Sequence, residues 1–327
     1  MHILITGAAG MIGRKLTQAL CARGKLRGQE ITGLTLVDVH PPVLPDGVTG
    51  AAMAVDLTDP AAAPALIEAR PDVVFHLAAI VSGEAEADTA KGYAVNLNGT
   101  VALCEAILAE EDYCPRFVFT SSIAVFGTPL PEVIDDDVPP RPLTSYGTQK
   151  LMSEMLIDDL SRKGRLDGVS LRLPTICIRP GKPNAAASGF YSSILREPLV
   201  GQEAVLPVSD TVRHWFASPR AAVGFLLHAA EMDTAPMGQS RALNLPGVNA
   251  TVGDEIAALE RIAGPAATAL IRREPDETIG RIVAVWPEAF DPARARSLGF
   301  EADADMDAIV RAHVEDELDG RIPVAET

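Results

Sequence analysis

Tyr146 and Lys150 stand four residues apart in a stretch with a helical pattern, so both side chains project from one face of the helix. This pairing suits the removal of a proton from a hydroxyl group. A free tyrosine has a pKa near 10, whereas a general base works best with a pKa near the working pH. A neighbouring ammonium favours the phenolate and so lowers the pKa of the tyrosine. We therefore predict that Tyr146 is a general base and that Lys150 tunes it.

Ser122 comes directly after an apolar run that ends in Thr120 and Ser121, at the expected carboxyl end of a strand. Its hydroxyl can hold a substrate hydroxyl next to Tyr146. A tyrosine and a lysine four residues apart also occur by chance on exposed helices. The strand before them and a glycine-rich loop near the N-terminus favour a catalytic role. We predict Ser122, Tyr146 and Lys150 as the catalytic residues.

The glycine-rich loop follows the first apolar run, with Gly7, Gly10 and Gly13 three residues apart. In a dinucleotide-binding loop, one glycine makes the tight turn and a second lets the backbone approach the pyrophosphate. A third lets the helix pack closely against the strand. The helix then begins with free N–H groups that bind phosphate. The sequence therefore predicts a dinucleotide site formed by Gly7, Gly10, Met11, Ile12 and Gly13.

Asp38 ends the second expected strand, where a carboxylate accepts hydrogen bonds from the adenosine ribose and repels a 2′-phosphate. We therefore predict NAD rather than NADP as the cofactor. Residues that follow the third and fourth expected strands are further predicted cofactor contacts, namely Asp56, Leu57, Leu77, Ala78 and Ala79.

Short apolar runs alternate with longer helical patterns through the first half of the chain. Strands are expected at 2–6, 34–38, 51–55, 72–77, 116–120 and 169–172, and helices at 11–23, 61–70, 92–110 and 145–163. Near-continuous apolar strands separated by helices predict a parallel sheet covered on both faces. Right-handed crossovers make this an α/β fold with a doubly wound sheet of the Rossmann type.

The sequence divides into two parts near residue 178. Residues 1–178 form the predicted NAD-binding domain, and a helix within 217–232 is expected to return to it. From residue 179 to 215, four prolines and several glycines predict an irregular segment over the carboxyl edge of the sheet. We therefore predict that residues 179–327 form mainly a smaller α+β lobe that binds the substrate.

The 327 residues carry a formal net charge of −16, and 47% of them are apolar. Such an acidic globular chain is a poor partner for nucleic acid or an anionic membrane, and no run approaches the roughly 20 apolar residues of a membrane span. The four cysteines lack metal-ligand spacing, which favours reduced thiols in the cytoplasm. No metal site is predicted. We expect His76 to be hydrogen-bonded and His214 to line the pocket.

The sequence resembles a known family, the extended short-chain dehydrogenases/reductases, which include nucleotide-sugar epimerases and dehydratases. The matching motifs are Thr6–Gly13, His76–Ala79, Asn96, Ser121-Ser122 followed by Val125–Gly127, and Tyr146–Lys150. The resemblance implies Ser122, Tyr146 and Lys150 as a catalytic triad with Asn96 as a support. It adds Asn96, Pro174 and Thr175 to the expected cofactor contacts. Phe126 departs from the family, which usually has tyrosine there.

The segment after the sixth strand also departs from the sugar-nucleotide enzymes, which usually carry an asparagine there that bonds the substrate diphosphate. Thr175 stands at that place, and basic residues follow at 179, 182 and 213. Arginine binds a carboxylate through two parallel hydrogen bonds. These residues therefore favour a small anionic substrate over a nucleotide sugar.

Residues 79–88, 173–176, 179–184 and 212–215 resemble the corresponding segments of dehydrogenases of four-carbon sugar acids within the same family. This resemblance implies NAD-dependent oxidation of a C2 hydroxyl to a 2-oxo acid, with Arg213 as the first choice for the carboxylate. The expected substrate contacts are Ser82, Ser122, Tyr146, Arg179, Asn184 and Arg213.

Two other functions remain open from the sequence. A nucleotide-sugar epimerase or dehydratase would retain NAD through turnover without net redox change. A non-enzymatic NAD sensor is disfavoured, because such proteins often lack the tyrosine or the lysine and both are present here. The family resemblance also implies a homodimer, with the helices at 92–110 and 145–163 packed against those of a second copy.

Overall fold

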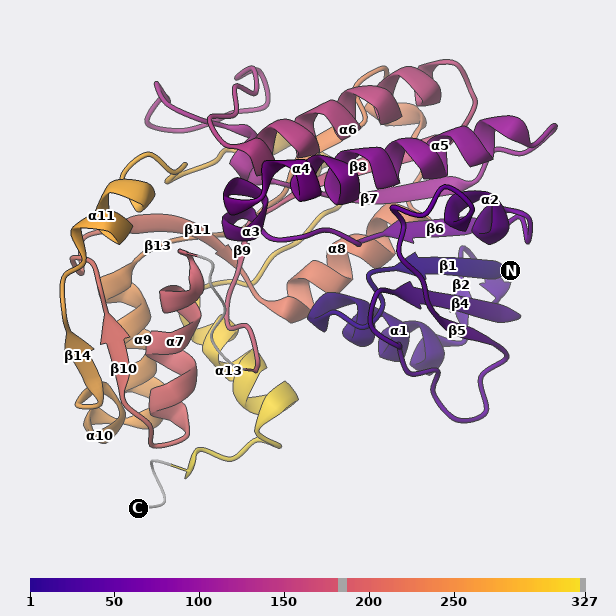
Figure 1. The fold of residues 1–327 in the computed structure, drawn as a ribbon. Coiled ribbons are helices and arrows are strands. Elements are labelled where there is room, and N and C mark those ends of the chain that lie inside the picture. Colours follow the sequence, from indigo (N-terminus) through magenta and orange to yellow (C-terminus); the bar gives the residue numbers. More distant parts are fainter. Residues whose placement is uncertain (182–186, 324–327) are drawn as a thin grey trace.

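The computed structural model describes residues 1–181 and 187–323. Its centre is a seven-stranded sheet in the order β12-β8-β7-β6-β1-β4-β5, in which every neighbouring pair is parallel. This confirms the predicted α/β, doubly wound fold (Figure 1). The strands are β1 (His2–Thr6), β4 (Gly33–Asp38), β5 (Gly50–Ala54), β6 (Val73–His76), β7 (Arg116–Ser122), β8 (Asp167–Leu173) and β12 (Ala242–Asn244).

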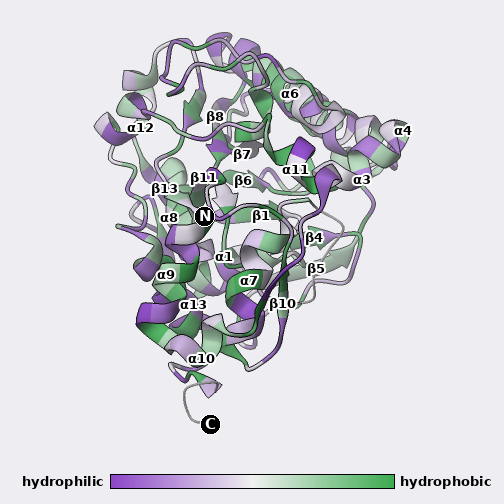
Figure 2. Ribbon diagram, turned by 90° about the vertical axis from the view of Figure 1, so that its left-hand side faces the viewer, coloured by the Kyte–Doolittle hydropathy of each residue, from purple (hydrophilic) through white to green (hydrophobic). Residues whose placement is uncertain are grey.

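Helices cover both faces of the sheet and bury two apolar layers. One layer lies between the sheet and the pair α1 (Met11–Arg23) and α8 (Pro219–Glu231), which pack against each other. The other layer lies under α2 (Ala62–Ile67), α5 (Gly99–Ala109) and α6 (Ser145–Arg162). Figure 2 shows α6 with alternating hydrophilic and hydrophobic residues, as expected for a helix with one buried face.

The helix expected at 92–110 is part of a longer helical rod. It starts with α4 (Thr89–Gly92), continues through a π-helical turn over Tyr93–Asn98 and ends in α5. A π-helical turn inserts one extra residue per turn and so re-aims the side chains after it. Because one extra residue shifts the apolar pattern only slightly, the pattern does not distinguish this turn from a continuous α-helix.

A smaller lobe follows the sheet and has its own apolar core. Its strands are β9 (Thr175–Ile176), β11 (Arg213–Ala217) and β13 (Val248–Thr251), which form one sheet, and β10 (Ala204–Leu206) and β14 (Ile271–Arg273), which form another. Its helices are α7 (Gly189–Leu199), α9 (Val252–Ala263), α10 (Pro265–Thr268), α11 (Glu277–Val283) and α13 (Met306–Glu317). This lobe lies at one end of the large sheet (Figure 1).

The boundary between the two parts is less simple than the sequence suggested. The helix expected within 217–232 is present as α8 and returns to the large sheet. The strand β12 also returns, pairing with β8 at the edge, although the sequence analysis assigned its residues to the lobe. A strand of three residues is too short to give a clear pattern. Among the described residues, no helix is both long and apolar enough to cross a membrane.

Candidate active site

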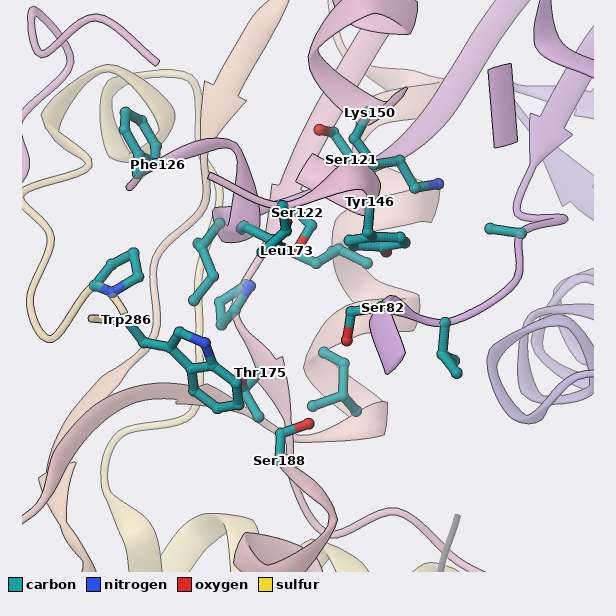
Figure 3. A pocket seen from close by; sticks show the side chains of 18 of the residues that line it. Ser82, Ser121, Ser122, Phe126, Tyr146, Lys150, Leu173, Thr175, Ser188 and Trp286 are labelled. Carbon is teal, nitrogen blue, oxygen red and sulfur yellow. Dashed lines mark hydrogen bonds between the residues drawn. The ribbon is translucent and has the colours of Figure 1, made fainter. Parts of the chain in front are cut away.

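A cleft of about 780 Å³ opens where the carboxyl ends of the central strands face the smaller lobe. Parallel strands place the loops that follow them at one edge, which is where ligands of open α/β sheets bind. Figure 3 shows Tyr146, Ser122 and Lys150 on one side of the cleft and Thr175, Ser188 and Trp286 on the other. The described part of the wall is formed by residues within 11–12, 77–82, 120–127, 143–150, 173–179 and 278–287, together with Ser188 and His214.

The loop after β1 can be formed only by small residues. Gly7 has φ +75°, and a Cβ there would lie 2.7 Å from the backbone nitrogen of Ala78. A Cβ on Gly13 would lie 2.3 Å from the carbonyl oxygen of Gly7. The helix α1 begins after Gly10 without a side-chain cap, so its first N–H groups are available to an anion. This geometry fits a dinucleotide pyrophosphate held by the backbone of residues 7–13.

Asp38 lies at the carboxyl end of β4, beside this loop. Its Oδ2 accepts a hydrogen bond from the backbone nitrogen of Ala9 at 3.0 Å, and its Oδ1 accepts one from His40 at 3.2 Å. The carboxylate is half-buried and fixed in place, with lone pairs left for ribose hydroxyls. Its position fits the predicted contact with an adenosine ribose.

Asp56 and Leu57 follow β5 and differ in their exposure. The Oδ1 of Asp56 accepts hydrogen bonds from the backbone nitrogen and the hydroxyl of Thr58, which lower the pKa of this carboxyl. Leu57 is buried in the apolar layer beneath α5. Neither residue lines the cleft as the described part of the chain defines it. Leu77 and Ala79 do line it, and Ala78 forms the backbone against which Gly7 packs.

The structure brings the three predicted catalytic residues together in the cleft wall. Lys150 is buried, and its Nζ donates a hydrogen bond to the carbonyl oxygen of Thr120 at 2.8 Å. The same Nζ lies 4.7 Å from the ring centroid of Phe119 and 5.6 Å from that of Tyr146. The Oγ of Ser122 accepts a hydrogen bond from the backbone of Ala124 at 3.1 Å, which orients it at the end of β7.

The protein groups alone do not lower the pKa of Tyr146 as the sequence analysis expected. Burial raises it to about 12, and the opposing effects of the Ser122 hydroxyl and the Arg179 guanidinium are smaller. Burial likewise lowers the pKa of Lys150 to about 7, against the attraction of Glu154. Desolvation penalises the charged form of each side chain. Ionisation of Tyr146 therefore requires charge beyond what the chain itself supplies.

Asn96 was expected to contact the cofactor, but it lies behind the cleft in the π-helical turn. Its Oδ1 accepts a hydrogen bond from the nitrogen of Ile80 at 2.8 Å, and its Nδ2 donates to the Oε1 of Gln149 at 2.8 Å. Asn96 is buried, because α6 covers it. It therefore connects α6 to the segment after β6.

His76 is hydrogen-bonded, as predicted. Its Nδ1 pairs with the hydroxyl of Thr6 at 2.7 Å and its Nε2 with that of Thr100 at 2.9 Å, and burial lowers its pKa to about 3. His214 lines the cleft, also as predicted. Pro174 and Thr175, expected as cofactor contacts, line the same cleft on the lobe side of β8.

Arg179 and Arg213 occupy different places. Arg179 lines the cleft, and its Nη2 donates hydrogen bonds to the Oγ and the carbonyl oxygen of Ser188 at 2.7 and 3.2 Å. Arg213 is exposed, points to Asn249 with its Nη1 at 2.5 Å from Oδ1, and is absent from the described cleft wall. Alternate residues of a strand face opposite sides, so β11 turns Arg213 away where it turns His214 inward. Arg213 therefore does not face the described cleft, and Arg179 replaces it as the candidate for the carboxylate.

Ser82 lines the cleft from the start of α3 (Ser82–Ala87). Asn184, the remaining predicted substrate contact, lies outside the described residues. No sequence pattern predicted the contribution of residues 278–287, which bring Arg281 and Trp286 to the cleft from α11 and the segment after it. These residues lie more than a hundred positions from the catalytic pair and have no recognisable motif. Only the tryptophan, one of two in the chain, was an unusual residue.

The model of the NAD dependent epimerase/dehydratase family matches residues 3–240. The chain belongs to this family. D-erythronate dehydrogenase of Cupriavidus necator is 46% identical over 97% of this chain and 98% of its own length. That of Haemophilus influenzae is 42% identical over 96% and 99%. Among solved structures, a nucleoside-diphosphate-sugar epimerase from Agrobacterium tumefaciens is 57% identical, with a TM-score of 0.96 over 98% of this chain and 96% of that one.

An L-threonine dehydrogenase from Clostridium difficile, 20% identical, has the same fold with a TM-score of 0.83 over 98% of both chains. The family and its dehydrogenase relatives confirm that the enzyme is an oxidoreductase that uses a nicotinamide cofactor. The names of the relatives point to two kinds of substrate, a sugar acid and a nucleotide sugar.

Replacing Gly7 by alanine should abolish most cofactor binding. The substitution combines a strained φ with a 2.7 Å approach to the Ala78 backbone, and we expect the Kd for NADH to rise about tenfold or more. Gly24→Ala is the matched control, because Gly24 also has a positive φ, of +63°, but has no atom within 4 Å of its Cβ position. It should cost about 1 kcal/mol of stability without changing cofactor affinity. NADH fluorescence titration measures both, and equal affinities in the two variants would contradict the assignment.

Proposed function

We propose that the enzyme oxidises the C2 hydroxyl of D-erythronate to the 2-oxo acid with NAD. The observation that carries this proposal is a guanidinium, Arg179, in the same cleft as the half-buried Tyr146 and the buried Lys150. A carboxylate on Arg179 would present its neighbouring C2 hydroxyl within a small, oriented ligand. The two D-erythronate dehydrogenases that match this chain over almost their whole lengths support that substrate.

The chain's own residues would divide the work as follows. Ser122, oriented by Ala124, receives the substrate hydroxyl at the end of β7. Tyr146 as phenolate accepts the hydroxyl proton, and Lys150 stabilises the phenolate from within the helix. When bound, the nicotinamide ring accepts the hydride and brings positive charge close to this pair. Arg179 holds the carboxylate end with Ser188 behind it.

The preference for NAD over NADP rests on Asp38. Both of its carboxylate oxygens are engaged by backbone N–H groups next to the glycine loop, so the charge cannot turn away from an approaching ligand. A 2′-phosphate at the adenosine ribose would meet this fixed negative charge at short range. NAD, with hydroxyls that donate hydrogen bonds there, is the cofactor we propose.

A second candidate function is a nucleotide-sugar epimerase, favoured by the 57% identity to a structure of that name. The two functions differ in their redox balance. An epimerase returns the hydride to its substrate and accumulates no reduced cofactor, whereas a dehydrogenase releases one NADH for each substrate oxidised.

The deciding experiment incubates the purified enzyme with NAD or NADP and one substrate at a time from a panel of C3–C6 hydroxy acids and nucleotide sugars. We expect stoichiometric NADH from D-erythronate, less from other acids, and little reduction of NADP. Absorbance at 340 nm follows reduced cofactor, and chromatography detects an epimerised nucleotide sugar. Epimerised product without NADH, together with no turnover of any acid, would establish the second function instead.

Tyr146→Phe and Lys150→Met should differ in their dependence on pH. The first removes the proton acceptor and should lower kcat at least about 100-fold at every pH. The second removes the amine 5.6 Å from the Tyr146 ring, which we expect to favour the phenolate when it is charged, so activity should recover partly as the pH approaches 10. The pH profile of kcat and the Kd for NADH are measured for both. Undiminished turnover in Tyr146→Phe, or a Lys150→Met profile with the wild-type optimum, would refute these roles.

Arg179→Met should raise KM for every acid of the panel about tenfold or more, because a charge-assisted hydrogen bond to the carboxylate is lost. Arg213→Met is the matched control on the same strand-rich lobe. Its guanidinium faces Asn249 on the surface, so KM should stay within about twofold of the wild-type value. A large rise in KM in Arg213→Met with an unchanged KM in Arg179→Met would instead make Arg213 the carboxylate receptor.

We also propose that the enzyme is a homodimer. On α6, Met152 and Met155 are 44% and 66% exposed, which leaves large apolar side chains on the helix that the family resemblance assigns to the subunit contact. Sedimentation of the purified enzyme reports the number of subunits, and a monomer at micromolar concentration would refute the dimer.

We propose the cytoplasm as the location of the enzyme. The free thiols Cys21, Cys104, Cys114 and Cys177 agree with a reducing compartment.

A further inference from the structure

Thr175 and His214 form a hydrogen-bonded pair on the lobe side of the cleft. The hydroxyl of Thr175 lies 2.7 Å from Nε2 of His214, and both residues line the cleft. They come from adjacent strands, because Thr175 in β9 pairs with Phe216, two residues beyond His214 in β11. Figure 3 shows Thr175 beside Trp286, away from Lys150. The pair therefore faces a part of the ligand other than the atoms that react at Tyr146.

The other ring nitrogen of His214 determines which residue of the pair donates the hydrogen bond and which accepts it. Its Nδ1 lies 3.1 Å from the carbonyl oxygen of Pro287, and a carbonyl oxygen can only accept a hydrogen bond. Nδ1 must therefore carry the proton. The ring is buried and burial lowers its pKa to about 4, so it is neutral at working pH and Nε2 has no proton. Nε2 must then accept, and the hydroxyl of Thr175 must donate to it.

Aromatic neighbours hold the imidazole ring in this orientation. Tyr191 stacks on it with a centroid distance of 5.2 Å and an interplanar angle of 3°. Trp286 lies at 5.4 Å, tilted by 40°, and Phe216 meets the ring nearly edge-on at 5.4 Å and 79°. A ring packed in this way cannot flip to exchange its two nitrogens without displacing its neighbours. The donor and acceptor roles of the pair are thus fixed before a ligand arrives.

We propose that Thr175 is a hydrogen-bond acceptor, fixed in that role by His214, that recognises a second hydroxyl of a polyhydroxy acid. Its only proton points to His214, so its oxygen offers lone pairs alone to the cleft. A ligand hydroxyl can donate to it. A carboxylate, an oxo group or an ionised phosphate oxygen has no proton to donate. Its lone pairs would repel those of the Thr175 oxygen. The inference rests on the proposed sugar-acid substrate and names the feature that separates it from simple 2-hydroxy acids.

This role also bears on the nucleotide sugars. The family resemblance places Thr175 where the sugar-nucleotide enzymes carry an asparagine, whose amide can donate to a diphosphate. An acceptor-only oxygen at that place favours a hydroxyl over a phosphate group. The proposal also makes Thr175 a substrate contact instead of the expected cofactor contact. A substrate contact affects kcat/KM for the acid, whereas a cofactor contact affects KM for NAD.

The test compares acids that differ by one hydroxyl, using the complete enzyme with saturating NAD. We would measure kcat/KM of the wild type, Thr175→Val and Thr175→Ser on D-erythronate, 2,4-dihydroxybutanoate and 2,3-dihydroxybutanoate. The last two acids lack the C3 and the C4 hydroxyl. Valine keeps the shape of threonine without its oxygen, and serine keeps the hydroxyl.

We expect Thr175→Val to lower kcat/KM for D-erythronate about tenfold or more and to leave one of the deoxy acids within about twofold. Thr175→Ser should retain most of the wild-type value, and KM for NAD should be unchanged in both. An equal loss on all three acids, no loss on any, or a rise in KM for NAD alone would overturn the proposal.

His214→Phe tests the dependence on the imidazole, because phenylalanine preserves the aromatic stack but has no acceptor for the Thr175 proton. Adding Thr175→Val to His214→Phe should cost much less than Thr175→Val does alone, since the two residues act as a unit. Fully additive losses would overturn the role of His214. Thermal unfolding identifies a His214→Phe protein that does not fold, in which case the Thr175 comparison decides by itself.

The proposed function and this inference fail in different ways. A wild-type enzyme that forms no NADH from any acid overturns both. A wild-type enzyme that oxidises D-erythronate, but whose preference between the three acids is unchanged in Thr175→Val, overturns the inference and leaves the proposed function standing.

Discussion

A buried ammonium determines much of this site. Lys150 is buried near the carboxyl end of β7. Removing an ammonium from water costs free energy unless hydrogen bonds and charges compensate. The carbonyl oxygen of Thr120 provides one bond, and Glu154, one helical turn further along α6, provides a negative charge. Glu154 is itself held by Arg172 in β8 at 2.8 Å, and Arg172 bonds Asn244 in β12 at 3.1 Å. The position of this lysine, the proposed partner of Tyr146, thus depends on β12 at the edge of the sheet.

The same burial makes the reactivity of the site depend on what binds there. Desolvation holds Tyr146 protonated, with a pKa of about 12, and lowers that of Lys150 to about 7. One of the two groups that oppose this effect on Tyr146 is Arg179, the proposed carboxylate receptor. A substrate carboxylate bound to Arg179 would neutralise part of the positive charge that lowers the pKa of Tyr146. Positive charge near the pair must then come from the cofactor side, so we expect the bound cofactor, and not the sugar acid, to favour ionisation of Tyr146.

The sequence predicted the cofactor half of the molecule because its signals are local. Buried strands, the glycine loop and a tyrosine four residues before a lysine are each readable within a few residues. The substrate half depends on long-range placement. In β11, adjacent residues must face opposite sides, but nothing in the local pattern says whether Arg213 or His214 faces the cleft. Trp286 reaches the site through a loop whose course only the fold determines, and the short β12 leaves no pattern at all.

The two halves also differ in how far the family model covers them. The family model ends at residue 240, which includes Tyr146, Lys150, Thr175 and Arg179 but excludes the segment that brings Arg281 and Trp286 to the cleft. Pro287, whose carbonyl fixes the tautomer of His214, lies in that same segment. Membership of the family therefore establishes hydride chemistry at the sheet, while the polarity of the opposite wall depends on residues beyond the family match. Discrimination between a sugar acid and a nucleotide sugar must be sought in that wall, because a change of a few residues there alters the ligand without disturbing the buried lysine.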